Sequence, residues 1–177
     1  MSLDWREITT QHGPLVWNAV YRILRSHSES LDCYQDVMLE AFEQSAVKEV
    51  ENWPGYLRWL AVRRGLDRLR ARNRSRQLVG EAPDIDCVSV DRHSDGDLLE
   101  MEELKDRLRS ELSTLPVQQA EAFWLRFVEQ MSYQEIAQQM DIDTNRVGVL
   151  IHRAKPRVRE TRCPIFNRTG DKARRIT

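Results

Sequence analysis

The sequence contains little of what marks several large classes of protein. Only 7 glycines and 6 prolines occur in 177 residues, too few for a linker-like or collagen-like chain, while 41% hydrophobic residues are too many for complete disorder. No apolar run approaches the roughly 18 residues that a membrane span needs. The first residues lack the basic and then apolar layout of a signal peptide. These absences predict a soluble, cytoplasmic protein of one ordinary domain or two small ones.

Cysteines and catalytic motifs are also sparse. Cys33, Cys87 and Cys163 are odd in number and far apart, which argues against a disulfide framework. The sequence has no glycine-rich phosphate loop, no H-E-x-x-H and no C-x-x-C, and its four histidines do not pair with cysteines at zinc-ligand spacing. We therefore expect a non-enzymatic protein with no catalytic site, no metal and no cofactor. A redox role for a cysteine stays open, although scattered cysteines are more often packing residues.

The net charge of −1 hides an uneven distribution of charge along the chain. Residues 54–76 contain eight arginines against one acidic residue, and residues 146–177 contain ten basic residues against two acidic ones. Between them, residues 77–112 contain eleven acidic residues and four basic ones. Two basic segments separated by an acidic one favour two contacts with a polyanion. Since 23 of the 27 basic residues are arginine, with its planar bidentate donors, nucleic acid is the polyanion that fits best.

Apolar residues recur at helical spacing, and no run alternates convincingly as a strand would. The pattern predicts one helix that begins at Pro14, a second with Asp32 as its N-cap and a third that begins at Pro54. Residues 77–97 lack this periodicity and predict an acidic linker. Whether this linker does more than connect stays open at this point. Helical spacing resumes at Met101.

The second half predicts a helix-turn-helix. Pro116 opens one helix, and Ser132 with Glu135 has the spacing of a capping box at the start of the next. A tight turn over residues 141–143 then leads to a helix that carries several basic residues, and a short helix, a turn and a basic helix form this motif. The basic residues of that last helix are Arg146, His152, Arg153 and Lys155, and we expect Pro156 to interrupt it.

Two surface patterns in the first half each have two interpretations. The arginines from Arg63 to Arg76 are either a solvated helix face or a nucleic-acid contact, and the second is favoured because only Asp67 opposes them within the run. Aromatic residues just upstream suit base stacking, although Tyr56 is expected in the core and Trp53 and Trp59 stay open. A mainly acidic line of four residues recurs at helical spacing: Asp36, Leu39, Glu40 and Glu43. This line is either an ordinary polar face or a docking surface for a basic protein.

At this point the chain resembles a bacterial RNA polymerase sigma factor of the small extracytoplasmic-function subfamily. The resemblance rests on residues 36–42, on residues 56–70 and on the helix-turn-helix of the second half. It implies an all-α fold of two small helical domains, the second of which has the helix-turn-helix. The first domain, residues 1–76, would bind the polymerase clamp and the minus-ten element. An acidic linker, 77–97, would join it to the second domain, residues 98–160, which would bind the minus-thirty-five element. A basic tail, 161–177, would follow.

The resemblance also implies roles for individual residues. The partners would be core RNA polymerase and promoter DNA, and an anti-sigma factor stays open as a third. The loop 46–53 would hold a flipped-out promoter base, and the linker would follow the path of the transcript. The expected polymerase-binding residues are Asp36, Leu39, Glu40 and Glu43. The expected minus-ten residues are Trp53, Trp59, Arg63, Arg64, Arg68, Arg70 and Arg72. The expected minus-thirty-five residues are Thr144, Asn145, Arg146, Gly148, Val149 and Arg153.

Some residues depart from the family pattern. Leu39 replaces a common Gln, and Asp141 replaces a frequent Gly, which Asp tolerates because it can adopt left-handed backbone angles. Gly148 and Leu150 replace residues that are often Lys and Arg. We therefore hypothesise that this factor depends on its minus-ten contact more than its relatives do. Leu150 could instead pack in the core, in which case it would not be a lost DNA contact, and this alternative stays open at this point.

Two rival functions remain possible from the residues alone. One is a stand-alone helix-turn-helix regulator whose first half is a dimerisation or sensing module. The other is a helical adaptor that binds an acidic partner through its arginines. Transcription with core polymerase, in the presence and absence of this protein, separates both from a sigma factor.

Overall fold

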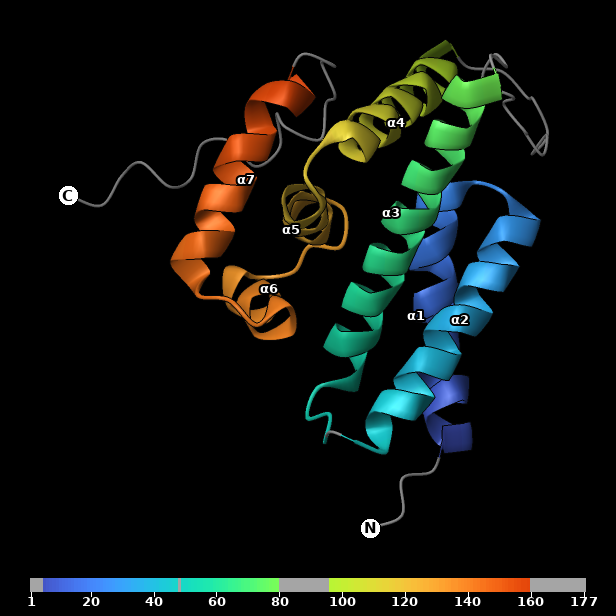
Figure 1. The fold of residues 1–177 in the computed structure, drawn as a ribbon, viewed down its shortest axis with the longest axis vertical. Coiled ribbons are helices and arrows are strands. Elements are labelled where there is room, and N and C mark those ends of the chain that lie inside the picture. The colour runs from blue at the N-terminus through green and yellow to red at the C-terminus, as the bar shows by residue number, and fades with distance from the viewer. Residues whose placement is uncertain (1–4, 48, 80–95, 160–177) are drawn as a thin grey trace.

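The computed structural model describes residues 5–47, 49–79 and 96–159, and within them it contains seven α-helices and no β-strand (Figure 1). The predicted all-α fold is confirmed. None of the helices in these ranges combines the length and the apolar character of a membrane span. The helices are α1 (Trp5–Leu24), α2 (His27–Ser45), α3 (Trp53–Val79), α4 (Gly96–Thr114), α5 (Val117–Phe127), α6 (Tyr133–Met140) and α7 (Thr144–Arg159).

The first three helices form a bundle that we call the N-terminal unit. Their apolar stripes meet in a core that includes the fully buried Ile23, Leu57 and Leu60. Gly65 lies at a close contact between α1 and α3, because a Cβ at this position would be only 2.9 Å from the Cδ1 atom of Ile23. A glycine here therefore lets the two helices pack more closely than any other residue would.

Two expected helix starts in this unit are wrong. Pro14 lies inside α1, which begins at Trp5, and Asp32 lies inside α2, whose N-cap is Ser26. A proline removes one backbone hydrogen bond, and burial of the turns before it holds the helix together. Ile8 is buried, and the Trp5 ring packs edge-on against another helix. The start of α2 is fixed by the Ser26 hydroxyl, which accepts a hydrogen bond from the Glu29 backbone N–H.

The last four helices form a second bundle that we call the C-terminal unit. The capping box is confirmed, since Ser132 and Glu135 exchange side-chain and backbone hydrogen bonds of 3.2 and 2.7 Å at the start of α6. Asp141 ends α6 in the left-handed conformation, with φ 53°. Asp143 caps α7 by accepting a hydrogen bond of 2.8 Å from the Arg146 N–H. The predicted helix-turn-helix is therefore α6, this turn and α7.

The expected interruption of the last helix at Pro156 is wrong, because α7 continues to Arg159. Pro156 lies within four residues of the helix end, where the missing N–H removes a single backbone hydrogen bond. Val158, one residue from the end, is fully buried and anchors the last turn. The expected basic tail, residues 161–177, lies outside the described residues.

The two units pack against each other across α3. Figure 1 shows α3 in the middle, with α1 and α2 on one side and α4, α5 and α6 on the other, and the contacts of α3 agree with this view. The backbone is helical to Val79 and again from Gly96, so the ends of the segment predicted as a linker are helical. Residues 80–95 of that segment lie outside the described ranges.

Candidate nucleic-acid and protein interfaces

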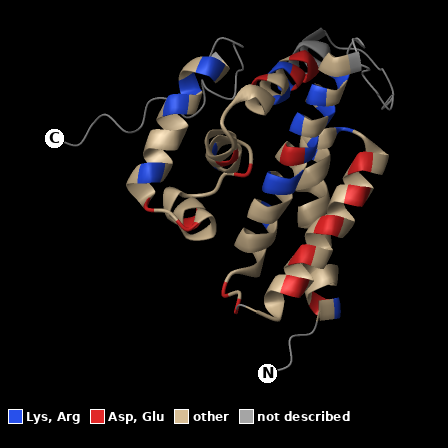
Figure 2. Cartoon of the chain, viewed as in Figure 1, with Lys and Arg blue, Asp and Glu red and all other residues tan. Residues whose placement is uncertain are grey.

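The acidic line predicted on α2 forms one face of that helix. Its carboxylates recur along α2 in Figure 2. Leu39 is 58% exposed in the middle of this face, and Asp36 and Glu43 are exposed as well. Glu40 is only partly exposed because it pairs with an arginine of α3. The structure thus brings the four predicted residues together on an accessible surface.

Within the run only Asp67 opposes the arginines of α3, but carboxylates of another helix, α2, oppose three of them. Arg64 contacts Glu40 at 2.5 Å, Arg72 contacts Glu29 at 2.6 Å, and Arg68 pairs with Asp36 between them. We call these three pairs the α2–α3 ladder. All three pairs are partly exposed, so each contributes little to stability and can exchange for other partners. The described structure therefore already pairs part of the expected polymerase surface with part of the expected DNA surface.

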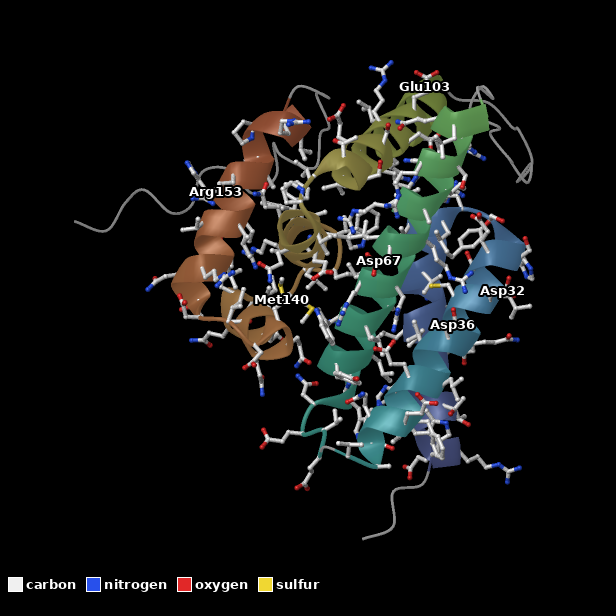
Figure 3. The ribbon with its side chains drawn as sticks, in the orientation of Figure 1. Asp32, Asp36, Asp67, Glu103, Met140 and Arg153 are labelled. Carbon is white, nitrogen blue, oxygen red and sulfur yellow. The ribbon has the colours of Figure 1, made fainter. Side chains whose placement is uncertain are left out.

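The opposite side of α3 faces the C-terminal unit. Arg70 lies there with only 12% of its side chain exposed and pairs with Asp67 at 3.2 Å. Arg63 is exposed and lies over the Trp59 ring, with 5.4 Å between the guanidinium carbon and the ring centroid. The minus-ten residues predicted on α3 therefore divide between two sides of the helix. Figure 3 labels Asp36 on α2 and Asp67 on α3.

Trp53 and Trp59 belong to a line of partly buried rings. The Trp53 centroid lies 5.6 Å from that of Trp5 and 6.2 Å from that of Tyr56, whose ring in turn lies 5.8 Å from that of Trp59. All of these rings pack against the hydrophobic core, as expected for Tyr56. The expectation that Trp53 and Trp59 contact DNA stays a prediction, and Trp59 would have to be uncovered for it.

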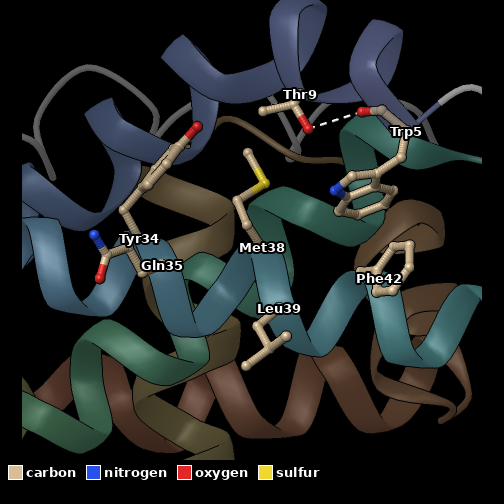
Figure 4. Close-up of a pocket in the computed structure, with 7 residues that line it drawn as sticks. All are labelled: Trp5, Thr9, Tyr34, Gln35, Met38, Leu39 and Phe42. Carbon is tan, nitrogen blue, oxygen red and sulfur yellow. Dashed lines mark hydrogen bonds between the residues drawn. The ribbon is translucent and has the colours of Figure 1, made fainter.

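A shallow groove of about 400 Å³ lies between α1 and α2 (Figure 4). Trp5, Met38, Leu39 and Phe42 are among the residues that line it. Phe42 is 51% exposed and packs edge-on against Trp5, with 5.4 Å between the ring centroids. The surface of α2 is therefore mixed: carboxylates lie beside accessible apolar groups.

The residues predicted to read the minus-thirty-five element lie on the outer surface of α7. Thr144, Asn145, Arg146, Val149 and Arg153 are exposed, and Gly148 is half-buried. Figure 3 shows Arg153 on the side of α7 that points away from α3. A second groove, of about 420 Å³, separates this helix from the start of α5. Arg146 contacts Gln118 across it at 3.3 Å.

Leu150 is 8% exposed and packs in the core of the C-terminal unit. The alternative that had stayed open is therefore confirmed, and Leu150 is not a missing DNA contact. Of the two family departures in α7, only Gly148 lies where an added charge would reach solvent. The hypothesis that this factor depends mainly on its minus-ten contact, because its minus-thirty-five contact is weak, therefore rests on Gly148 alone.

We predict that Gly148→Lys strengthens binding of this protein to duplex minus-thirty-five DNA several-fold. A Cβ at this position would lie 3.8 Å from the Tyr133 ring, an ordinary contact, and both lysine and alanine favour a helix more than glycine does, by up to about 1 kcal/mol. Fluorescence anisotropy with labelled duplex measures the affinity. Gly148→Ala is the matched control, since it gains helix stability without charge. Equal affinity of the Lys and Ala variants would remove the hypothesis.

One group with possible chemistry, the thiol of Cys33, is accounted for by packing. Cys33 is fully buried between charged neighbours, and burial raises the pKa of its thiol to about 11, so it stays protonated and unreactive near neutral pH. Cys87 and Cys163 lie outside the described residues. Within the described ranges, no group of three histidine, cysteine or acidic residues is placed to hold a metal.

Sequence reasoning missed the residues that join the two units. Glu129 follows α5 and lies near Arg22 of α1 and Arg58 of α3. Glu102 of α4 pairs with Arg25 at 2.8 Å, and Arg109, 7% exposed, donates a hydrogen bond to the Arg22 carbonyl. No local spacing signals contacts between such distant positions. The α2–α3 ladder was different, because its three arginines and two of its three carboxylates recur every four residues in the sequence.

Two family models match the chain, in the order that the two units follow. Sigma-70 region 2 matches residues 8–75, and sigma-70 region 4 matches residues 105–158. Together they cover most of the described chain, including the acidic face, the arginine helix and the helix-turn-helix. The chain therefore belongs to the sigma-70 family of RNA polymerase sigma factors, and the resemblance drawn from its motifs is confirmed.

Individual relatives agree with this family. The chain is 24% identical over 157 residues to the ECF RNA polymerase sigma factor SigE of Mycolicibacterium smegmatis, which covers 89% of this chain and 61% of that relative. It therefore spans about three fifths of that protein's length. The co-crystal structure of the sigma factor RpoE with the anti-sigma factor NepR from Bartonella quintana matches with a TM-score of 0.57 at 19% identity, over 89% of this chain and 96% of that chain. This likeness supports the fold.

Proposed function

We propose that this protein is a non-enzymatic initiation factor that binds core RNA polymerase, directs it to a class of promoters and helps to open the DNA. One observation carries the proposal: regions 2 and 4 of the family occur in order in one chain, and each presents an accessible surface suited to its partner. α2 presents carboxylates around Leu39, and α7 presents a polar and basic face. An anti-sigma factor is a further partner of the kind that the RpoE structure contains.

The proposed roles follow the two units. In the N-terminal unit the acidic face of α2 binds a basic surface of the polymerase, while the arginines of α3 neutralise phosphates at the minus-ten element. In the C-terminal unit phosphate contacts hold α7 in the major groove, where a few side chains read base edges. The loop 46–53 remains the proposed site for a flipped base; its Val47 is 83% exposed.

The experiment that tests the proposal is selection of promoters by the reconstituted complex. Core polymerase with this protein should retain a specific set of fragments from sheared genomic DNA, and core polymerase alone should not. Specific retention by the protein alone would instead favour the stand-alone regulator. Retention that is equal with and without the protein would contradict the proposal.

We predict that Glu43→Lys weakens binding to core polymerase about tenfold, which corresponds to about 1.4 kcal/mol. The substitution places a positive charge opposite a basic partner, and like charges across an interface are unfavourable. Glu43 is a cleaner position than Glu40, whose replacement would also disturb Arg64. Binding of labelled core polymerase measures the effect. Gln44→Lys adds the same charge at an exposed neighbouring position outside the acidic line and should change affinity little.

We also predict that replacing Arg64 and Arg68 by Gln makes promoter binding by the holoenzyme less sensitive to salt. Each phosphate contact contributes about one unit to the slope of log affinity against log salt concentration, so the slope should flatten by at most about two units. Filter binding over a series of salt concentrations gives the slope. Arg107, 65% exposed on α4, provides the control change to Gln. An unchanged slope would show that these arginines form a solvated helix face and do not contact phosphates.

A further inference from the structure

Two accessible apolar side chains lie on the surface proposed to bind the polymerase. Leu39 is 58% exposed and Phe42 is 51% exposed, and both line the groove between α1 and α2, which we call the α1–α2 groove (Figure 4). Single exposed apolar residues are common on protein surfaces, whereas apolar residues that share one hollow indicate a binding site. This clustering distinguishes the pair from Leu78 of α3, which is 87% exposed and lines neither of the two grooves described above.

The wall of the groove on α1 lies at the start of that helix. Trp5 is outside residues 8–75, which match region 2 of the family. Its backbone carbonyl accepts a hydrogen bond of 2.8 Å from the Thr9 hydroxyl (Figure 4). Its ring packs edge-on against those of Phe42 and Trp53, with centroids 5.4 and 5.6 Å away. These contacts hold the wall in place before a partner binds, which lowers the ordering cost of binding.

The wall on α2 carries a departure from the family pattern. Leu39 stands where the family commonly has Gln, so this chain offers apolar surface at a position where its relatives offer a hydrogen-bonding amide. Met38, which also lines the groove, lies deeper and is 8% exposed. Binding energy at protein interfaces is concentrated in a few central residues that a polar rim shields from water. Leu39 lies between Asp36 and Glu43 on α2, so it has the central position and the carboxylates belong to the rim.

The chemistry of the groove and its neighbours restricts what can bind there. Trp5, Met38, Leu39 and Phe42 make the lining mainly apolar. The exposed carboxylates of the acidic line repel phosphates and other carboxylates, so nucleic acid and acidic peptides are unsuited, and they attract basic side chains. The occupant that fits both parts is an apolar side chain with basic residues around it.

We propose that the α1–α2 groove anchors this protein to core polymerase by taking an apolar side chain from the basic surface of the polymerase, and that Leu39 and Phe42 determine the affinity. This inference rests on the proposed function, and it adds to the charge pairing of the acidic line a contact that salt does not screen. Because Leu39 replaces the glutamine common in the family, the anchor is a property of this chain. It should let binding persist at salt concentrations that remove the electrostatic part.

Four single changes to Gln in the full-length protein test the anchor. Leu39→Gln restores the residue common in the family, and Phe42→Gln removes the ring from the groove. Glu43→Gln removes one charge of the acidic line, and Leu78→Gln makes the same apolar-to-polar change outside the groove. All four side chains are exposed, so thermal melting should show little change in stability. Binding of each protein to labelled core polymerase is measured at about 0.05 M and about 0.5 M salt.

Leu39→Gln and Phe42→Gln should each weaken binding about fivefold or more at both salt concentrations, relative to the unaltered protein. Glu43→Gln should weaken binding at low salt and lose most of this effect at high salt, because exposed charges are screened. Leu78→Gln should match the unaltered protein. Groove variants that bind as well as Leu78→Gln would overturn the anchor, and so would a loss that disappears at high salt. Absence of binding between the unaltered protein and core polymerase would instead overturn the proposed function, together with the occupant named here.

Discussion

Leu150→Arg should lower the free energy of unfolding of the C-terminal unit by about 3 kcal/mol or more. Leu150 is 8% exposed in the core beneath the recognition helix. The arginine would lose the packing of the leucine and would bring a charge to an apolar site, where an unpaired charge is unfavourable. The family often places a charged residue at this position, so a reading of the sequence alone expects the same substitution to improve DNA binding.

Thermal melting of the variant measures this effect, and Val149→Arg is its control. Val149 is adjacent in the sequence but 47% exposed, so its replacement should change stability by no more than about 0.5 kcal/mol. Equal melting temperatures for the two variants would contradict the placement of Leu150. A stable Leu150→Arg variant with improved duplex binding would restore the original hypothesis that both departures weaken the minus-thirty-five contact.

Glu121→Gln should stabilise the protein above neutral pH by up to about 3 kcal/mol. Burial raises the pKa of this carboxyl from 4.5 to about 7, so the folded protein holds the proton where the unfolded chain has lost it. Between these two values stability from this group falls as the pH rises, and above about 7 the loss is complete. Glutamine keeps the shape and is neutral throughout, so the variant should lack this part of the pH dependence.

The measurement compares denaturant unfolding of the Glu121→Gln variant and the unaltered protein from about pH 4.5 to pH 8. The difference in unfolding free energy should grow across this range and then level off. Other carboxyls contribute to both proteins and cancel in the difference, including Glu102 and Glu135, whose hydrogen bonds to Lys105 and Ser132 help to lower their pKa. Glu103→Gln is the control, because it removes a carboxylate whose side chain is 59% exposed. A difference that is constant with pH would contradict the burial of Glu121 against α3.

Most of the fold was predictable because it is encoded locally. The apolar stripes of period 3.6, the capping box at Ser132 and the acidic turn before α7 each act within a few residues, and each lies where the sequence predicted it. The wrong helix starts have a different cause. Pro14 and Asp32 are good boundary residues by local rules, and here the burial of Ile8 and the capping by Ser26 outweigh them.

The surfaces were predictable as residue sets but not as interactions. The spacing of Asp36, Glu40 and Glu43 placed them on one face of α2, yet the pairing of Glu40 with Arg64 depends on how α2 packs on α3. The same holds for Glu129, whose partners lie more than 70 residues away in the sequence. Charge counts show which segments are acidic or basic, but tertiary packing determines which charges meet.

In vitro transcription from a promoter fragment retained by the reconstituted complex tests the central claim most directly. Core polymerase alone should give no specific product from this fragment, and addition of the protein should give a transcript with one defined start. Glu43→Lys should reduce the yield of that transcript at limiting protein concentration. Specific DNA binding by the protein without any defined transcript would contradict the account and favour a stand-alone regulator.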